Sequence, residues 1–203
     1  MNAFVFPGQG SQHIGMGSNL YNSSQKAQQI FEDANEILGF KLTDIMFGQD
    51  QEALKQTKIT QPAIYIHSMV IAQIANKFFK PNAVAGHSLG EFTALAAANY
   101  ISFEDGLRLV QKRAIAMQEA CEKTESSMAA IVGLEDKIVE DVCLQSEEIL
   151  VAANYNCPGQ IVISGTTKAI NIACNKLTEL GAKRALTLPV RGAFHSPLMK
   201  SAE

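Results

Sequence analysis

The five residues GHSLG at positions 86–90 constrain the fold of this chain more than any other stretch. They match G-x-S-x-G, a pattern that places a serine on a tight turn between a β-strand and an α-helix. A short apolar run precedes them at 83–85, and an alanine-rich run follows at 92–98. The context predicts a strand, a turn that exposes the Ser88 hydroxyl, and a helix. The alternative is a glycine-rich turn in which the serine is incidental.

The first part of the chain alternates between segments typical of strands and of helices. An apolar run at 3–6 predicts a short buried strand, which a glycine-rich turn at 7–11 ends. Gly39 is expected to cap a helix at its C-terminus, and Pro62 suits the first turn of another. Helical signals occur at 18–38 and 102–122, and the apolar residues at 63–79 lie on most sides of a helix, which predicts a buried core helix there. Strands and helices in this order predict a parallel α/β core.

The pattern changes after residue 124. Strand-like runs occupy 127–133, 149–154, 160–164 and 183–190, and helical runs occupy 134–146 and 168–180. The order βαββαβ is that of a ferredoxin-like unit. We therefore predict a subdomain at 126–190 that is inserted into an α/β core made of 1–125 and 191–203. Few residues remain for the core to resume after the insertion, so the chain is expected to be truncated at its C-terminus.

Composition argues against several classes of protein. A net charge of −3 leaves no basic stripe to neutralise phosphates, which argues against a nucleic-acid binder. The four cysteines are widely spaced and form no C-x-x-C pair, so they predict reduced thiols and no metal site. No basic leader precedes the first strand-like run, and the apolar stretch at 63–79 is too polar and too short to span a bilayer. The sequence thus predicts a cytoplasmic protein that does not bind membranes.

A serine hydroxyl needs a base that accepts its proton, and the chain has four histidines. His195 is the preferred base, because it follows the serine as in hydrolase-like folds and lies in a loop bounded by glycine and proline. A histidine of a surface loop is the alternative there. His67 falls within the buried helix and is expected to be a core residue. His87 adjoins Ser88 but points elsewhere when the serine is at the apex of the turn, and His13 lies beside the first glycine-rich turn.

Acyl transfer also needs backbone N–H donors for the oxyanion of its intermediate. The Leu89 amide, directly after the serine, is expected to be one donor. The loop at 7–10 is the candidate for the second, because its glycines allow close approach of the main chain. A plain strand-to-helix connection is equally compatible with that loop. Arg113 falls on the flank of the buried face of its helix, where it either covers apolar surface with its stem, which the pattern favours, or clamps a carboxylate.

Five motifs occur together in a fixed order. They are FPGQGSQ at 6–12, GHSLGE at 86–91, the helix that carries Arg113, NYNCPGQ at 154–160 and AFHSPLM at 193–199. From Ala3 to Met199 the chain closely resembles the bacterial malonyl-CoA:acyl carrier protein transacylase family of fatty acid biosynthesis. The resemblance implies an α/β-hydrolase-like parallel-sheet core with an inserted ferredoxin-like subdomain.

The resemblance also implies a role for particular residues. Ser88 would attack the malonyl thioester and hold malonate as an ester, while His195 would take its proton and later activate the phosphopantetheine thiol of acyl carrier protein. The amides of Gln9 and Leu89 would form the oxyanion hole. Arg113 would pair with the free carboxylate of malonate. The further residues that it places around the substrate are His87, Asn156 and Phe194.

Malonyl-CoA and acyl carrier protein are the partners that the resemblance implies, for a monomeric enzyme with no metal or redox cofactor and a CoA thioester as its substrate. The ring of Phe194 would leave little room for a 2-methyl branch. In this family a main-chain carbonyl from beyond residue 203 orients the histidine, so the chain as given is expected to have little transferase activity and low stability by itself. Basic residues occur near the end of the subdomain, where a solvated face is favoured over a carrier-protein surface, at Lys183, Arg184 and Arg191.

Two other interpretations stay open. One is a serine hydrolase of the esterase or patatin type, which shares the G-x-S-x-G turn but has no use for a carboxylate clamp at Arg113. The other is either the acyltransferase domain of a polyketide-type assembly or a docking module without catalytic activity, for a carrier protein or for such an assembly.

Overall fold

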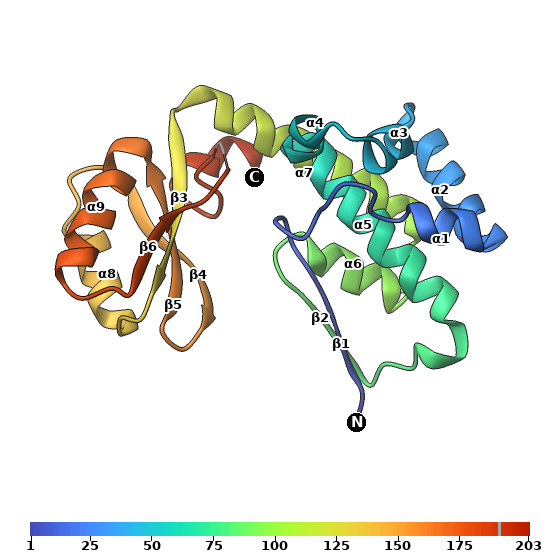
Figure 1. Cartoon of the computed structure of the whole chain (residues 1–203), viewed down its shortest axis with the longest axis horizontal. Coiled ribbons are helices and arrows are strands. Elements are labelled where there is room, and N and C mark those ends of the chain that lie inside the picture. The colour runs from blue at the N-terminus through green and yellow to red at the C-terminus, as the bar shows by residue number, and fades with distance from the viewer. Residues whose placement is uncertain (191) are drawn as a thin grey trace. The chain divides into compact units, whose positions relative to one another are not determined.

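The computed structural model describes residues 1–190 and 192–203. They form two compact units, Met1–Ile115 and Ala116–Glu203 (Figure 1). The strands of the first unit are β1 (Ala3–Phe6) and β2 (Ala83–Gly86). Its helices are α1 (Ser18–Ser23), α2 (Gln25–Leu38), α3 (Leu42–Phe47), α4 (Gln51–Lys55), α5 (Thr57–Ala75), the 3₁₀ helix η1 (Asn76–Phe78), α6 (Gly90–Ala97) and the first part of α7 (Phe103–Lys123).

Strands β1 and β2 pair in parallel, with Phe6 opposite Gly86. The pairing continues beyond the strands, since the His87 amide donates to the Phe6 carbonyl at 3.0 Å. A Cβ on Gly86 would lie 1.9 Å from the Gly90 carbonyl carbon, and a Cβ on Gly90 would lie 2.2 Å from the Phe6 carbonyl oxygen. Both glycines therefore allow the start of α6 to contact the ends of β1 and β2, backbone against backbone.

Gly86→Ala is expected to lower the free energy of unfolding of the full-length protein by about 3 kcal/mol, because backbone atoms have no alternative rotamer that relieves the clash. Gly39→Ala is the control. Gly39 has φ 77°, but a Cβ there would meet no atom within 4 Å, so the cost is about 1 kcal/mol of backbone strain. Urea unfolding measures both, and equal losses for the two variants would contradict the close approach.

Helix α5 begins at Thr57, so Pro62 lies inside it and the prediction that Pro62 is in its first turn is wrong. The Gln56 carbonyl accepts hydrogen bonds from the amides of Ile59 and Thr60 at 2.8 Å, and these bonds form the first turn of the helix. The sequence of this turn shows no apolar periodicity. The missing N–H of the proline costs the helix one backbone hydrogen bond. The helix is buried over most of its length, as predicted. None of the helices in the described part of the chain, α5 included, is long and apolar enough to cross a membrane.

The helical signal at 18–38 corresponds to two helices. Ser24 separates α1 from α2 in an extended conformation, and its hydroxyl caps α2 by accepting from the Ala27 amide at 3.2 Å. Gly39 ends α2 in the left-handed conformation, as predicted. The short helices α3 and α4 are missing from the prediction, because five or six residues carry too little periodicity.

The second unit contains the end of α7, a sheet of four strands and the helices that cover it. Its strands are β3 (Ser126–Val132), β4 (Leu150–Cys157), β5 (Gln160–Thr166) and β6 (Arg184–Thr187), and its helices are α8 (Asp136–Leu144), α9 (Thr167–Glu179) and the 3₁₀ helix η2 (Pro197–Ala202). The strands are antiparallel throughout, in the order β4-β5-β3-β6. This order confirms the ferredoxin-like unit and, together with the parallel β1–β2 pair, the α/β fold class.

Both faces of the four-stranded sheet are covered. Helices α8 and α9 pack on one face, against a core that includes Ala129, Ile131 and Ile163 (Figure 1). On the other face, the residues that alternate with these along the strands pack against the end of α7 and the C-terminal segment. The buried residues of this second cluster are Met117, Ala120, Met128, Ala130, Val162, Phe194 and Met199. The division into a core at 1–125 and 191–203 and a subdomain at 126–190 stays a prediction.

Candidate active site

Ser88 lies on the turn between β2 and α6, in the place that the sequence predicts. Its φ of 54° falls in the left-handed region, which costs a residue with a side chain about 1–3 kcal/mol and is typical of functional turns. The Gly90 amide donates to the His87 carbonyl at 2.9 Å, so the first turn of α6 fixes the bend. The Ser88 side chain is partly exposed and His87 is exposed, while Leu89 is buried at the start of the helix.

The Arg113 guanidinium lies directly beside this serine. Its Nη2 donates to the Ser88 hydroxyl oxygen at 3.0 Å, and its Nη1 donates to the side-chain oxygen of Gln61 at 2.7 Å. The guanidinium carbon lies 5.8 Å from the centre of the Phe92 ring, within the range of a cation–π contact. The helix pattern alone favours an arginine that covers apolar surface. The structure instead aims its charged end at the candidate nucleophile.

Electrostatics around Arg113 suit the binding of an anion. Burial lowers the pKa of Arg113, and the charge of Glu91 opposes that shift. The side chain remains protonated at neutral pH, because the ordinary arginine pKa lies far above it. Since the oxygens of Gln61 and Ser88 that accept its hydrogen bonds are neutral, the guanidinium keeps a net positive charge next to the serine. This arrangement can hold a carboxylate in a two-pronged contact close to the reacting hydroxyl.

Gln61 is the site residue that sequence reasoning missed. It lies on α5, is 1% exposed, and contacts Arg113 across 52 positions of sequence. The signal for it in the sequence is a lone amide at the start of the long apolar run, which by itself does not distinguish a buried hydrogen bond from a helix end. The contact with Arg113 supplies the buried amide oxygen with a charge-assisted donor.

The glycine-rich loop after β1 lies against the turn that carries Ser88. A Cβ on Gly8 would be 2.6 Å from the His87 carbonyl oxygen, so the two backbones touch immediately before the serine. The loop is held in shape by the Ser11 hydroxyl, which donates to the Gly8 carbonyl at 3.0 Å. Gln9 follows Gly8 in this loop and is partly exposed. The structure therefore places both predicted amide donors, Gln9 and Leu89, in segments that meet at the turn, and their role in an oxyanion hole stays a prediction.

Three predicted site residues belong to the second unit. His195 has φ 56°, another left-handed backbone in a residue with a side chain, and precedes η2. Phe194 is 7% exposed and packs in the cluster on the sheet face away from α8 and α9. Asn156 is exposed near the end of β4. The structure thus gathers Ser88 and Arg113 within the first unit, and the pairing of that serine with His195 stays a prediction.

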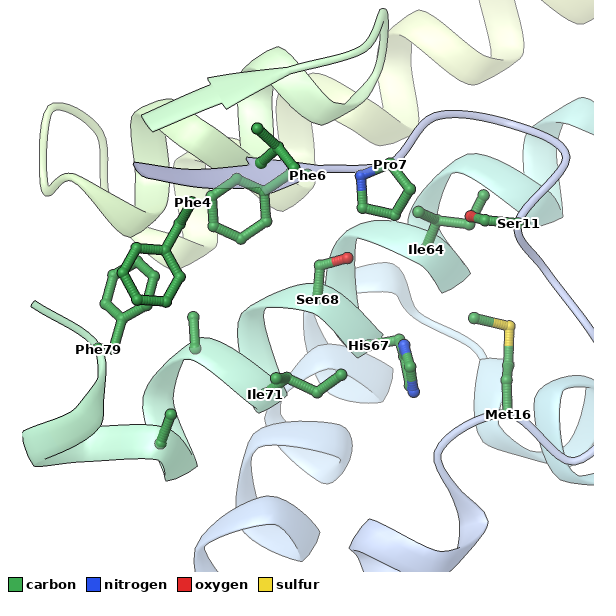
Figure 2. A pocket seen from close by; sticks show the side chains of 13 residues that line it. Phe4, Phe6, Pro7, Ser11, Met16, Ile64, His67, Ser68, Ile71 and Phe79 are labelled. Carbon is green, nitrogen blue, oxygen red and sulfur yellow. The ribbon is translucent and has the colours of Figure 1, made fainter. Parts of the chain in front are cut away.

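A separate apolar cavity lies between β1 and α5 in the first unit. Its volume is about 310 Å³, and Phe4, Phe6 and Phe79 line it together with Ile71 (Figure 2). His67 also lines the cavity. The sequence predicts that His67 is a core residue, whereas the structure shows it half-buried. Its ring lies edge-on to that of His13 with 6.4 Å between centroids. Burial and the nearby His13 lower the pKa of His67.

Comparison with known proteins assigns a family to these features. Residues 3–203 match the family model described as acyl transferase domain. A malonyl CoA-acyl carrier protein transacylase of Bacillus subtilis (strain 168) is 46% identical, over 98% of this chain and 64% of the relative. A protein of the same name from Staphylococcus aureus (strain MRSA252) is 43% identical, over 99% of this chain and 66% of the relative. The chain therefore spans slightly less than two thirds of the length of these relatives.

Solved structures are similar over the same extent. The malonyl CoA-acyl carrier protein transacylase of Coxiella burnetii superposes with a TM-score of 0.94 at 39% identity, covering 98% of this chain and 65% of that protein. A malonyl-transacylase solved in complex with its type II polyketide synthase acyl-carrier protein superposes with a TM-score of 0.93 at 38% identity. That match covers 98% of this chain and 66% of the other.

Proposed function

Because this chain belongs to the acyl transferase domain family, we propose that it transfers the malonyl group of malonyl-CoA to the phosphopantetheine thiol of acyl carrier protein, in fatty acid biosynthesis. The observation that carries the proposal is the guanidinium of Arg113, 3.0 Å from the Ser88 hydroxyl oxygen. Malonyl differs from acetyl by one ionised carboxylate. A fixed positive charge next to the nucleophile matches that difference.

The reaction proceeds in two half-reactions through an ester on Ser88. His195 accepts the proton of the serine hydroxyl as its oxygen attacks the thioester carbonyl, and the amides of Gln9 and Leu89 stabilise the oxyanion that forms. The carbon–sulfur bond then breaks, and the CoA sulfur leaves with the proton from His195. The second half-reaction reverses these steps, with the phosphopantetheine thiol as the attacking group. Arg113 holds the malonyl carboxylate throughout.

Other parts of the proposal concern the surroundings of the site. The bulky ring of Phe194 disfavours a 2-methyl branch on the acyl group, and His87 and Asn156 line the substrate cleft. The enzyme needs no metal or redox cofactor, acts as a monomer and is located in the cytoplasm. Lys183 and Arg184 are exposed, which suits either a solvated face or a contact with an acidic carrier protein, and Arg191 lies outside the described residues.

Two alternative functions rest on particular observations. The turn that carries Ser88 is also that of serine hydrolases. The similarity to the malonyl-transacylase in complex with a polyketide carrier protein favours an acyltransferase of a polyketide-type assembly. The charge of Arg113 beside the serine favours a malonyl transferase over a serine hydrolase, which has no use for it. A transferase of fatty acid biosynthesis and one of a polyketide-type assembly differ only in the carrier protein that accepts the malonyl group.

Incubation of the full-length protein with malonyl-CoA in the absence of a carrier protein tests the proposal. After rapid quenching and digestion, mass spectrometry is expected to find one malonyl group, on the peptide that contains Ser88. Addition of acyl carrier protein with its phosphopantetheine arm then moves the group to the arm. A hydrolase would instead release free malonate as fast as CoA, and a docking module would carry no adduct. Either result would overturn the proposal.

A further inference from the structure

The backbone at His195 needs support from its surroundings. Its φ of 56° lies in the left-handed region, which residues with a side chain adopt only where neighbouring contacts hold them. A histidine that transfers protons must also keep its ring within a narrow range of positions. The groups that hold the backbone just before His195 therefore contribute to the position and direction of its imidazole.

Two buried serines of the four-stranded sheet hold the backbone just before His195. The Ser164 hydroxyl donates to the Phe194 carbonyl at 2.7 Å, and this carbonyl belongs to the peptide bond between Phe194 and His195. The Ser126 hydroxyl oxygen accepts from the Ala193 amide at 3.1 Å, two peptide bonds earlier. Ser164 is 0% exposed and Ser126 is 9% exposed, so neither bond competes with bulk water.

The sheet register explains why both hydroxyls reach the same loop. Ser164 on β5 lies opposite Met128 on β3, and Ser126 lies two residues before Met128 on the same strand. Side chains two residues apart share a face of a strand, and Met128 packs in the cluster with Phe194. The two serines therefore lie on the face that meets the loop, away from the face that packs on α8 and α9.

We propose that Ser164, assisted by Ser126, is a positioning residue for His195: its hydroxyl fixes the carbonyl before His195 and thereby the direction of the imidazole. The proposal rests on the proposed role of His195 as the base in acyl transfer. It gives the ferredoxin-like unit a catalytic purpose, since two of its central strands hold the loop of the base. Without the Ser164 hydroxyl, the Phe194 carbonyl loses a buried partner, and the plane of the Phe194–His195 peptide can reorient through the neighbouring φ and ψ angles.

Kinetics of the full-length protein provide the first test. Ser164→Ala is expected to lower kcat for malonyl transfer about tenfold, with KM for malonyl-CoA within about twofold, because binding does not need the base. Ser164→Thr keeps the hydroxyl and is expected to restore most of kcat. Ser127→Ala is the matched control, since Ser127 is equally buried on β3 but lies on the opposite face of the strand from Ser126. A Ser164→Thr variant that is no faster than Ser164→Ala overturns the proposal.

An NMR titration of the His195 imidazole provides a second test that does not depend on catalysis. Its C–H signal, assigned with His195→Gln, is expected to titrate at a different pH in Ser164→Ala and at the wild-type pH in Ser127→Ala. An unchanged titration in folded Ser164→Ala overturns the proposal. If Ser164→Ala does not fold, Ser126→Ala is expected to shift the titration of His195 relative to the wild type, and an unchanged titration overturns the proposal equally. These outcomes differ from a failure of the proposed function, in which the wild-type protein itself would form no malonyl-serine.

Discussion

Ser88→Ala is expected to reduce malonyl transfer by the full-length protein about 10⁴-fold or more, because in the proposed reaction its hydroxyl oxygen carries the acyl group between the two thiols. Alanine keeps the Cβ and thus the same left-handed strain, so the turn after β2 is expected to survive the change. Steady-state release of CoA in the presence of acyl carrier protein measures the rate. Intact mass after incubation with malonyl-CoA shows whether an adduct remains.

Binding is expected to survive the loss of the hydroxyl. In the proposed function the carboxylate of malonyl-CoA contacts Arg113. Because Arg113 keeps its contact with Gln61 in Ser88→Ala, the Kd for malonyl-CoA is expected to stay within about threefold of the wild-type value. Ser68→Ala is the control for removal of a hydroxyl elsewhere, since Ser68 lines the cavity between β1 and α5. A Ser88→Ala variant that still forms an adduct at a substantial rate would show that another residue is the nucleophile.

Local signals in the sequence were sufficient for the part of the site that depends on the turn. The G-x-S-x-G pattern, with its apolar run before and alanine-rich run after, predicts β2, the exposed serine and α6, and the structure has all three. The reason is that the contact of Gly86 with Gly90 lies within five residues of sequence. The βαββαβ order was predictable for a similar reason, because β3, β4, β5, α8 and α9 are each at least seven residues long and show their period.

Contacts between segments that are distant in the sequence could not be predicted from local sequence patterns. The position of Arg113 on the flank of α7 is compatible with covering apolar surface or with binding a carboxylate. Only the packing of that helix against α5 and the turn shows that the guanidinium lies beside Ser88. Gln61 lies at the start of an apolar run and Ser164 at the end of one, and a period of 3.6 or 2 does not reveal which distant group each one meets. The start of α5 at Thr57 was missed because its first turn is formed by backbone hydrogen bonds to Gln56 without an apolar pattern.

Arg113→Ala is expected to lower kcat/KM for malonyl-CoA by about 10²- to 10³-fold, since the loss of one partner of a partly buried ionic contact costs roughly 3–4 kcal/mol. Transfer of acetyl from acetyl-CoA is expected to change by less than about threefold, because acetyl has no carboxylate for the guanidinium to bind. The ratio of the two rates is the measurement. It separates recognition of the acyl group from any general damage to the site, which would lower both rates.

Two further variants show whether charge at this position is the cause. Arg108→Ala removes an exposed arginine from the same helix, where it pairs with Glu104, and is expected to leave the malonyl-to-acetyl ratio unchanged. Gln61→Glu keeps Arg113 but gives it a carboxylate partner of nearly the same shape, so the positive charge is compensated before the substrate arrives. It is expected to lower the malonyl rate selectively, as Arg113→Ala does. If Arg113→Ala reduced the malonyl and acetyl rates equally, Arg113 would act through the structure of the turn, and the selectivity for malonyl would need another source.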